Sequence, residues 1–208
     1  MQYKDYFHFH SLKIFLHPEV YEPAEDTFMM LDSINVSSDD TVLEIGTGTG
    51  IIALDCAMKG ATVICSDCNP YAVELVKKNI EENKSILTGL IDVRYGKLFD
   101  IIHQNESFDL IVFNPPYLTT AKEEYVGETG WFDMAVSGGN SGLKTTASFL
   151  NKLSKYLADE GRAFIIFSTN SPKKRYNQIL KKNKLVQTTV SKQSFINETI
   201  EVHKITKK

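Results

Sequence analysis

Two short segments of the chain carry residue types and spacings suited to binding a small ligand. The first, Glu44–Gly50 (EIGTGTG), holds three alternate glycines, which let a backbone turn sharply and approach a ligand closely. The third glycine comes one residue too early for the G-x-G-x-x-G pattern of a dinucleotide site. Glu44 would repel a phosphate, so the segment favours a cationic group such as an aminoacyl ammonium. Asp67, about 20 residues after the glycines, suits the acceptance of hydrogen bonds from ribose hydroxyls. These features favour S-adenosylmethionine over NAD as the ligand.

The second segment, Asn114-Pro115-Pro116-Tyr117, has the composition of a site for a planar nitrogen. The side-chain oxygen of Asn114 and the carbonyl oxygen of Pro115 can each accept a hydrogen bond, which suits an NH₂ group with two donors. The ring of Tyr117 can stack on the flat group that carries this nitrogen. Alignment of nitrogen, methyl and sulfur can lower a barrier by up to ~7–11 kcal/mol, so no dedicated base is required. The segment therefore predicts methyl transfer to a planar nitrogen.

Alternating strand-like and helical runs must position these residues. Strands are predicted over 41–46, 62–67, 91–95, 108–113 and 162–168, and helices over 50–59, 70–84, 143–157 and 173–182. Asn69 is the expected N-cap of the second helix, and Gly161 follows the end of the third. Runs 186–194 and 199–205 are expected to close the fold as an antiparallel pair. Strands that alternate with helices predict a parallel sheet covered on both faces, with Glu44, Asp67 and Asn114 at its carboxyl edge.

Composition limits the class of protein. The 208 residues are 42% hydrophobic and 24% charged, which is typical of a globular domain, and we expect one domain over 1–208. No apolar run approaches the ~18 residues of a membrane span, and the N-terminus does not resemble a signal peptide, so a cytoplasmic location is expected. Residues 170–208 carry ten basic and two acidic side chains, a net +8. This basic segment is either a solvated surface or a nucleic-acid surface, and the first is favoured.

Cys65 and Cys68 form a lone CxxC motif. A zinc site would need two further ligands nearby, and no histidine spacing supplies them. We therefore favour the interpretation that the two cysteines have this spacing by coincidence, at the end of a buried strand. No metal is predicted.

With the glycine segment, Asp67 and NPPY in place, the chain resembles class I methyltransferases that act on planar nitrogens. The stretch Val20–Thr27 (VYEPAEDT) looks like the segment before the first strand in short HemK-type enzymes, the archaeal and eukaryotic release-factor glutamine N5-methyltransferases. The stretch Ala135–Gly142 (AVSGGNSG) resembles their glycine-rich segment after NPPY. The similarity covers about residues 18–170.

This resemblance implies a Rossmann-like α/β fold with a seven-stranded, mostly parallel sheet, the last strand antiparallel, and helices on both faces. It implies S-adenosylmethionine as methyl donor and S-adenosylhomocysteine as product, with segment 1–40 covering the cofactor. The catalytic residues would be Asn114, Pro115, Pro116 and Tyr117, which hold the glutamine amide. The cofactor-binding residues would be Tyr21, Pro23, Thr27, Glu44, Gly46, Thr47, Gly48, Asp67, Cys68, Asn69, Leu98 and Asn114.

One residue departs from the family pattern. These enzymes usually place an aspartate where Lys97 stands, and that aspartate meets the adenine amino group. The backbone of Leu98 or a water would have to replace it here. The resemblance also implies a class 1 release factor as protein substrate, and a small zinc-binding activator subunit on a sheet edge as a possible partner.

Three functions remain open on these grounds. The favoured one is methylation of the glutamine of a GGQ motif in a class 1 release factor. The second is methylation of adenine N6 or guanine in a nucleic acid with the same NPPY motif, for which residues outside the common fold are few. The third is a non-catalytic subunit that binds S-adenosylmethionine, which would have no physical need of the NPPY acceptors.

Overall fold

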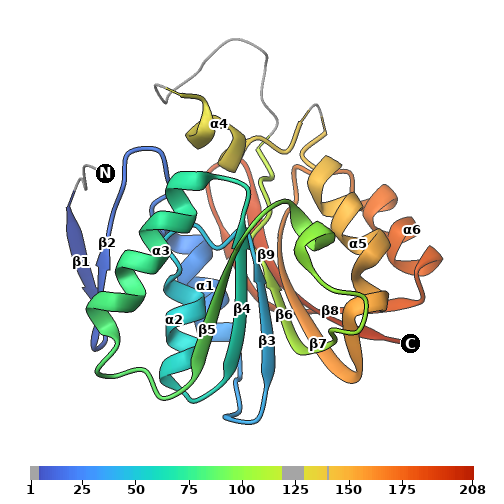
Figure 1. Cartoon of the computed structure of the whole chain (residues 1–208). Coiled ribbons are helices and arrows are strands. Elements are labelled where there is room, and N and C mark those ends of the chain that lie inside the picture. Colours follow the sequence, from blue (N-terminus) through green and yellow to red (C-terminus); the bar gives the residue numbers. More distant parts are fainter. Residues whose placement is uncertain (1–4, 119–128, 140) are drawn as a thin grey trace.

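A twisted seven-stranded sheet forms the centre of the molecule, as the computed structural model shows for residues 5–118, 129–139 and 141–208 (Figure 1). The strands are β1 (Tyr6–Phe9), β2 (Leu12–Phe15), β3 (Thr41–Ile45), β4 (Thr62–Asp67), β5 (Leu90–Tyr95), β6 (Phe108–Phe113), β7 (Leu157–Ser168), β8 (Leu185–Ser194) and β9 (Thr199–Lys207). The helices are α1 (Glu25–Ser33), α2 (Ile51–Met58), α3 (Pro70–Asn83), the 3₁₀ helix η1 (Leu98–Ile101), α4 (Trp131–Val136), α5 (Lys144–Tyr156) and α6 (Lys173–Lys182).

The strand order is β5-β4-β3-β6-β7-β9-β8, with β1 and β2 forming a separate hairpin. Neighbouring strands from β5 to β7 run parallel, whereas β9 runs antiparallel to both β7 and β8. The predicted fold class is confirmed, including the antiparallel last strand. Because the order reverses between β3 and β6, the carboxyl ends of these two strands flank the switch point where such sheets bind ligands.

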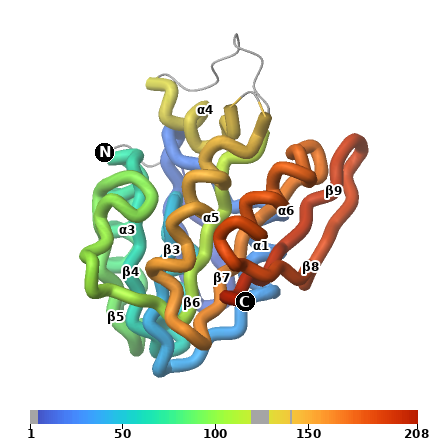
Figure 2. The backbone as a smooth tube through the Cα atoms, turned by 90° about the vertical axis from the view of Figure 1, so that its right-hand side faces the viewer, coloured from blue at the N-terminus to red at the C-terminus, as the bar shows by residue number. Residues whose placement is uncertain are grey.

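Alternate residues of the strands build two cores. Val42, Val63 and Val112 point to the face covered by α1, α2 and α3. Their neighbours Leu43 and Ile64 point to the opposite face, where α5 and α6 pack. Figure 2 shows α5 in front of the strands with α6 beside it. Burial on both faces explains why the strands are apolar along their length, as expected for parallel strands. None of the described residues belongs to a helix that is long and apolar enough to cross a membrane.

The transition from α5 to β7 corrects one prediction. Gly161 lies beyond the end of α5, as the sequence predicts, but the strand predicted to start at Arg162 starts directly after α5, at Leu157. Gly161 lies inside this strand, where the register with β6 shifts. A Cβ at Gly161 would lie 2.9 Å from the carbonyl oxygen of Phe108. The glycine permits a close approach of two strands at an irregularity, which in the sequence is indistinguishable from a helix stop.

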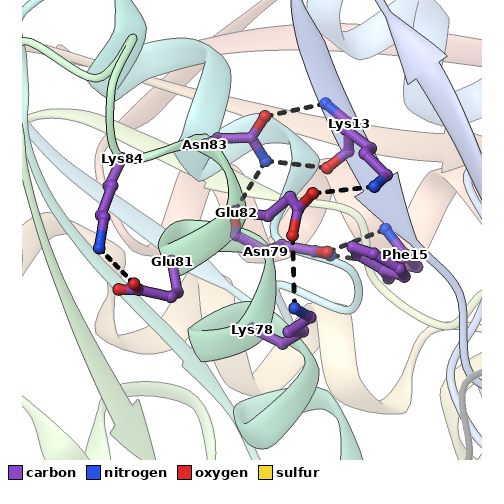
Figure 3. Close-up of polar contacts among 8 residues, drawn as sticks. All are labelled: Lys13, Phe15, Lys78, Asn79, Glu81, Glu82, Asn83 and Lys84. Carbon is purple, nitrogen blue, oxygen red and sulfur yellow. Dashed lines mark hydrogen bonds and ion pairs between the residues drawn. The ribbon is translucent and has the colours of Figure 1, made fainter.

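The hairpin β1–β2 and helix α1 were not predicted from the sequence. Two asparagines of α3 fasten the hairpin by pairing with the backbone of β2 (Figure 3). Asn79 Oδ1 accepts from Phe15 N at 2.8 Å, and Asn83 Oδ1 accepts from Lys13 N at 2.8 Å. Asn79 Nδ2 also donates to the carbonyl oxygen of Thr49 at 2.9 Å. One buried amide therefore connects the N-terminal hairpin to the glycine loop after β3.

We predict that Asn79→Ala destabilises the protein by about 1–3 kcal/mol, because the backbone groups of Phe15 and Thr49 lose buried partners. Denaturant unfolding measures the loss, and hydrogen exchange should show faster exchange of the Phe15 amide. Glu81→Ala on the exposed side of the same helix is the control, expected within about 0.5 kcal/mol of wild type. Equal stability and unchanged Phe15 exchange in Asn79→Ala would contradict this account.

Candidate active site

The loop between β3 and α2 depends on its glycines. Gly46, Gly48 and Gly50 have φ values of 67°, 56° and 79°, which residues with a Cβ rarely adopt. A Cβ at Gly50 would lie 3.0 Å from both methyl groups of Val76 on α3. The third glycine thus permits close packing of the loop against α3, and the first two shape the turn beside the cavity.

Glu44, in β3, holds this loop by hydrogen bonds. Its side chain is 3% exposed, and Oε2 accepts hydrogen bonds from Thr47 Oγ1 at 2.6 Å and from Ala53 N at 3.0 Å. Burial raises the pKa of Glu44 to about 8, although these two hydrogen bonds act in the opposite direction. Glu44 therefore fastens the loop to the first turns of α2, and it also lines the cavity.

Asp67 joins the loop to the end of β4. Its Oδ2 accepts from Gly48 N at 3.0 Å, and its Oδ1 accepts from Asn69 N at 2.9 Å. Burial raises the pKa of Asp67, and the backbone donors partly offset the effect. Each carboxylate oxygen has room for a second donor, so these bonds leave acceptor capacity for hydroxyl groups. The carboxylate is held in place before any ligand binds.

Asn69 and the two cysteines lie at the same end of the sheet. Asn69 Oδ1 accepts from Tyr71 N at 2.9 Å and caps α3 as predicted, while Nδ2 donates to the carbonyl oxygen of Glu19 at 2.7 Å. Both ends of its side chain therefore have structural partners. Cys65 is buried in β4, whereas Cys68 is half-buried and lines the cavity. Within the described ranges, no three His, Cys, Asp or Glu side chains are grouped as a metal site.

On the other wall of the cavity, Asp26 in α1 accepts hydrogen bonds from several residues. Its Oδ2 accepts from Asn114 Nδ2 at 3.0 Å and from the Tyr117 hydroxyl at 3.1 Å. Its Oδ1 accepts from the Tyr21 hydroxyl at 3.2 Å and from Thr27 N at 2.7 Å. Asp26 lies in the family-like stretch Val20–Thr27, but its role cannot be predicted from the sequence, because its partners Asn114 and Tyr117 are distant in the chain.

These contacts define the state of the side chains around Asp26. Because a carboxylate only accepts, Nδ2 of Asn114 must face Asp26, and the amide oxygen lies on the other side of the group. Burial and the neighbouring Asp26 raise the pKa of both Tyr117 and Tyr21, so both phenols stay protonated and donate. The result is one fixed orientation for the Asn114 amide.

The glycine-rich segment predicted after NPPY packs directly beside it. Leu118 N donates to the carbonyl oxygen of Val136 at 3.0 Å, and Gly138 N donates to that of Leu118 at 2.9 Å. A Cβ at Gly142 would lie 2.4 Å from the carbonyl oxygen of Tyr117. Small residues are thus required where the two segments touch. Asn140 of this stretch lies outside the described residues.

The rim near η1 contains the residue that replaces the family's aspartate. Lys97 is exposed, and Leu98 has a φ of 50°, a left-handed conformation that is unfavourable for a leucine. Gly96, with a φ of 156°, allows the turn into η1. A Cβ at Gly96 would lie 2.1 Å from the side chain of Ile101. Leu98 lines the cavity, and its role toward an adenine stays a prediction.

A cavity of about 390 Å³ unites these parts at the carboxyl ends of β3, β4 and β6. Every residue predicted from the sequence as catalytic or cofactor-binding contributes to its walls. Its further walls, which the sequence analysis did not identify, include Val20, Asp26, Ile51, Ala72, Trp131, Met134 and Lys144. Most of these are apolar residues whose pattern does not separate a cavity wall from a core. The volume is within the ~300–1,000 Å³ of small-molecule sites.

The chain is similar in sequence to known methyltransferases. The family model of the methyltransferase small domain matches residues 17–137. A Methanocaldococcus jannaschii protein, provisionally named a protein N5-glutamine methyltransferase, is 38% identical over 162 residues, which cover 76% of this chain and 77% of that protein. Methyltransferase HEMK2 of Homo sapiens is 31% identical over 201 residues, covering 91% and 90%.

Among solved structures, the Mtq2–Trm112 complex of E. cuniculi, described as responsible for methylation of the translation termination factor eRF1, is similar in fold. Its TM-score is 0.67 at 22% identity, over 91% of this chain and 99% of the matched one. A fold and a site of this kind define a class I methyltransferase. The chain belongs to the methyltransferase small-domain family and, within it, to the short HemK-type proteins.

We predict a pH-dependent stability that originates in Glu44. Its pKa in the folded chain, about 8, lies above the ordinary 4.5, so the protonated form favours folding. The stability it contributes is complete below pH ~4.5 and is lost as the pH rises through 8. Relative to Glu44→Gln, the wild type should lose up to about 1.4 kcal/mol per pH unit between roughly pH 5 and 8.

Urea unfolding of the ligand-free protein across this range measures the difference. Glu74→Gln, at an exposed glutamate on α3, is the matched control and should follow the wild-type curve. Parallel pH curves for wild type and Glu44→Gln would show that Glu44 does not titrate in this window.

Proposed function

We propose that this chain transfers a methyl group from S-adenosylmethionine to the side-chain amide nitrogen of the glutamine in the GGQ motif of a class 1 release factor. The observation that carries the proposal is the fixed orientation of the Asn114 amide, whose nitrogen is held by Asp26. The similarity to a protein named as an N5-glutamine methyltransferase and to the Mtq2–Trm112 complex supports the choice of substrate.

The residues present fit the proposed donor. Gly46 and Gly48 form a turn that side chains would fill, and Gly48 N is tied to the carboxylate of Asp67. We propose that Asp67 accepts from ribose hydroxyls and that the buried carboxylate of Glu44 favours the positive charge of the aminoacyl part. When bound, S-adenosylmethionine supplies a methyl group on a sulfonium centre. Segment 1–40 contributes Tyr21, Pro23 and Thr27 to the cover of this site.

The remaining predicted residues complete the cofactor site in the same proposal. Thr47, Cys68, Asn69 and Leu98 provide main-chain atoms and walls around the ligand, because they line the cavity between the carboxyl ends of the strands. Asn69 does so from a side chain that already caps α3. The strained backbone of Leu98 would meet the adenine in place of the family's aspartate.

At the acceptor end, the chain's own groups position a poor nucleophile. We propose that Asn114 Oδ1 and the carbonyl oxygen of Pro115 each accept one N–H of the substrate amide, with Pro116 making the segment rigid. The ring of Tyr117 stacks on the planar amide while its hydroxyl donates to Asp26. As the substrate nitrogen becomes positive, the two acceptors bind its N–H groups more strongly, which stabilises the transition state selectively.

A methylation assay tests the proposal. The chain is incubated with labelled S-adenosylmethionine and a release factor, beside tRNA, rRNA and DNA, and the labelled residue is mapped by mass spectrometry. We expect label on the glutamine of the GGQ motif. The Asn114→Ala variant should be about 10²–10³-fold slower than the wild type, because a hydrogen-bond acceptor is removed from the site. Near-wild-type turnover of Asn114→Ala, with folding intact, would exclude the amide clamp.

Asp26 should act as a positioning residue, and Asp26→Asn tests this role. We expect a single-turnover rate lowered by about 10- to 100-fold with little change in substrate affinity, because a neutral amide cannot accept from Asn114, Tyr117 and Tyr21 together. Glu25→Gln, the adjacent exposed residue with the same loss of charge, is the matched control and should retain wild-type rates. A loss confined to substrate affinity would show that Asp26 does not orient the acceptor.

The second candidate is methylation of adenine N6 or guanine in a nucleic acid. It is favoured by the basic surface of the C-terminal third, and an exocyclic amine offers the same two N–H donors. Label that appears in RNA or DNA, and not in the release factor, would select it.

A partner subunit is part of the proposal. The solved complex of Mtq2 with Trm112 supports a small activator subunit, which we propose to be zinc-binding and to dock on an edge of the sheet. The edge strand β5 exposes 73% of Leu90 and 62% of Tyr95, which makes it the favoured edge. We place this activity in the cytoplasm, the compartment in which release factors meet the ribosome.

A further inference from the structure

The face of the molecule formed by α5 and α6 is strongly basic. No aspartate or glutamate occurs between Met134 and Ala158 or between Gly161 and Asn197. These two stretches contain helices α5 and α6, which cover one side of the sheet (Figure 2). The charge asymmetry of the sequence is therefore also an asymmetry between the two faces of the sheet.

The two helices lie side by side, so their charges share one surface. Ser154 Oγ on α5 donates to the carbonyl oxygen of Asn183, just beyond α6, at 2.9 Å, and Asn183 Nδ2 donates to Asn151 Oδ1 at 3.0 Å. We define the basic face by the exposed cations that make no ion pair within the described part of the chain: Lys155, Lys174, Arg175, Lys181, Lys182 and Lys184.

Folding explains only part of this concentration of charge. Tyr176 and Leu180 anchor α6 to the core, and among the cations of this helix only Lys173 has an ion-pair partner within the described residues, Glu201 at 3.7 Å. Lys174 and Arg175 lie in the first turn, where the helix dipole disfavours positive charge, whereas Lys181 and Lys182 lie in the last turn, where it favours positive charge. Mutual repulsion of like charges adds to this cost. A role in binding an anion accounts for Lys174 and Arg175, whose charges the helix itself disfavours.

We infer that the basic face binds the phosphodiester backbone of a nucleic acid. The exposed positions of α6 hold only lysine, arginine, asparagine and glutamine, which are among the side chains that contact phosphate and sugar in complexes with nucleic acids. An acidic protein fits less well, because protein interfaces are depleted in lysine and enriched in aromatic and apolar residues, which α6 does not expose. The partner class is thus a polyanion held by charge.

This face adjoins the proposed active site. Lys144, the first residue of α5, is exposed and also lines the cavity. A nucleic acid on α5 and α6 would therefore lie beside the rim of the cavity as a docking partner, whether or not it accepts a methyl group. The inference stands independently of the release-factor assignment.

The test compares two variants with the same change in net charge. In the first, Lys174, Arg175, Lys181 and Lys182 are replaced by glutamine. In the matched control, Lys59, Lys77, Lys78 and Lys84 on the opposite face, all of which are ion-paired, are replaced by glutamine. Binding to labelled single-stranded RNA, duplex RNA and duplex DNA is measured by fluorescence anisotropy between about 50 and 200 mM salt.

We expect the wild type to bind at least one of these probes with strong salt dependence. The basic-face variant should lose at least about tenfold in affinity and lower the salt slope by roughly three to four, about one for each charge removed. The matched control should stay within about twofold of wild type. Both variants should methylate an RNA-free release factor at the wild-type rate, so a failure of the proposed function would show in that assay alone.

Three results would overturn the inference. The first is the absence of measurable binding to all three probes at the lowest salt. The second is an equal loss of affinity in the matched control, which would indicate a non-specific effect of net charge. The third is competition by poly-L-glutamate as effective as that by unlabelled RNA, which would make the face a site for acidic proteins.

Discussion

The carboxylate of Asp26 is the acceptor on which the architecture of this active site depends. It receives hydrogen bonds from Asn114 and Tyr117 on one side and from Tyr21 and Thr27 on the other. A buried carboxylate needs such donors, because an unpaired charge in a site of low polarity is strongly unfavourable. The donors gain a fixed orientation in return. The segment that covers the cavity and the segment that carries the proposed chemistry are therefore held by the same group.

On the opposite wall of the cavity, two further carboxylates hold the backbone in place by accepting hydrogen bonds. Glu44 fastens the glycine loop to α2, and Asp67 fastens it to the end of β4. Burial raises the pKa of both groups, which shows that each is held at some electrostatic disadvantage when no cation is bound. A ligand with positive charge would relieve that disadvantage. The acidic interior and the strained glycine turns are thus pre-organised for such a ligand, and they reduce the ordering that binding requires.

One face of the exterior carries positive charge, whereas the cavity contains carboxylates. Helices α5 and α6 contain no acidic residue, and only Lys152 and Lys173 among their cations have acidic partners, on other elements, within the described part of the chain. On the opposite face, Lys59 after α2 and the lysines in and just after α3 are ion-paired with glutamates and an aspartate. An acidic cavity beside a basic surface separates two kinds of recognition. The cavity suits a small cationic cofactor, and the surface suits an extended anion. Such a division can steer a large partner to the rim of the site without affecting the chemistry within it.

The sequence by itself determined the strand and helix alternation, the sheet class and many of the residues that line the cavity. These features are local: the glycine loop, the Asn69 cap and the NPPY segment can be read from neighbouring residues, because turn geometry and hydrogen-bonding capacity depend on short stretches of chain. Only the tertiary structure decided the rest. Asp26 meets Asn114 across 88 positions, and Asn79 meets Phe15 across 64. Gly161 lies within a strand because of its neighbour Phe108. Such contacts arise when the sheet brings distant segments together, and no local pattern specifies which buried polar group will find which partner.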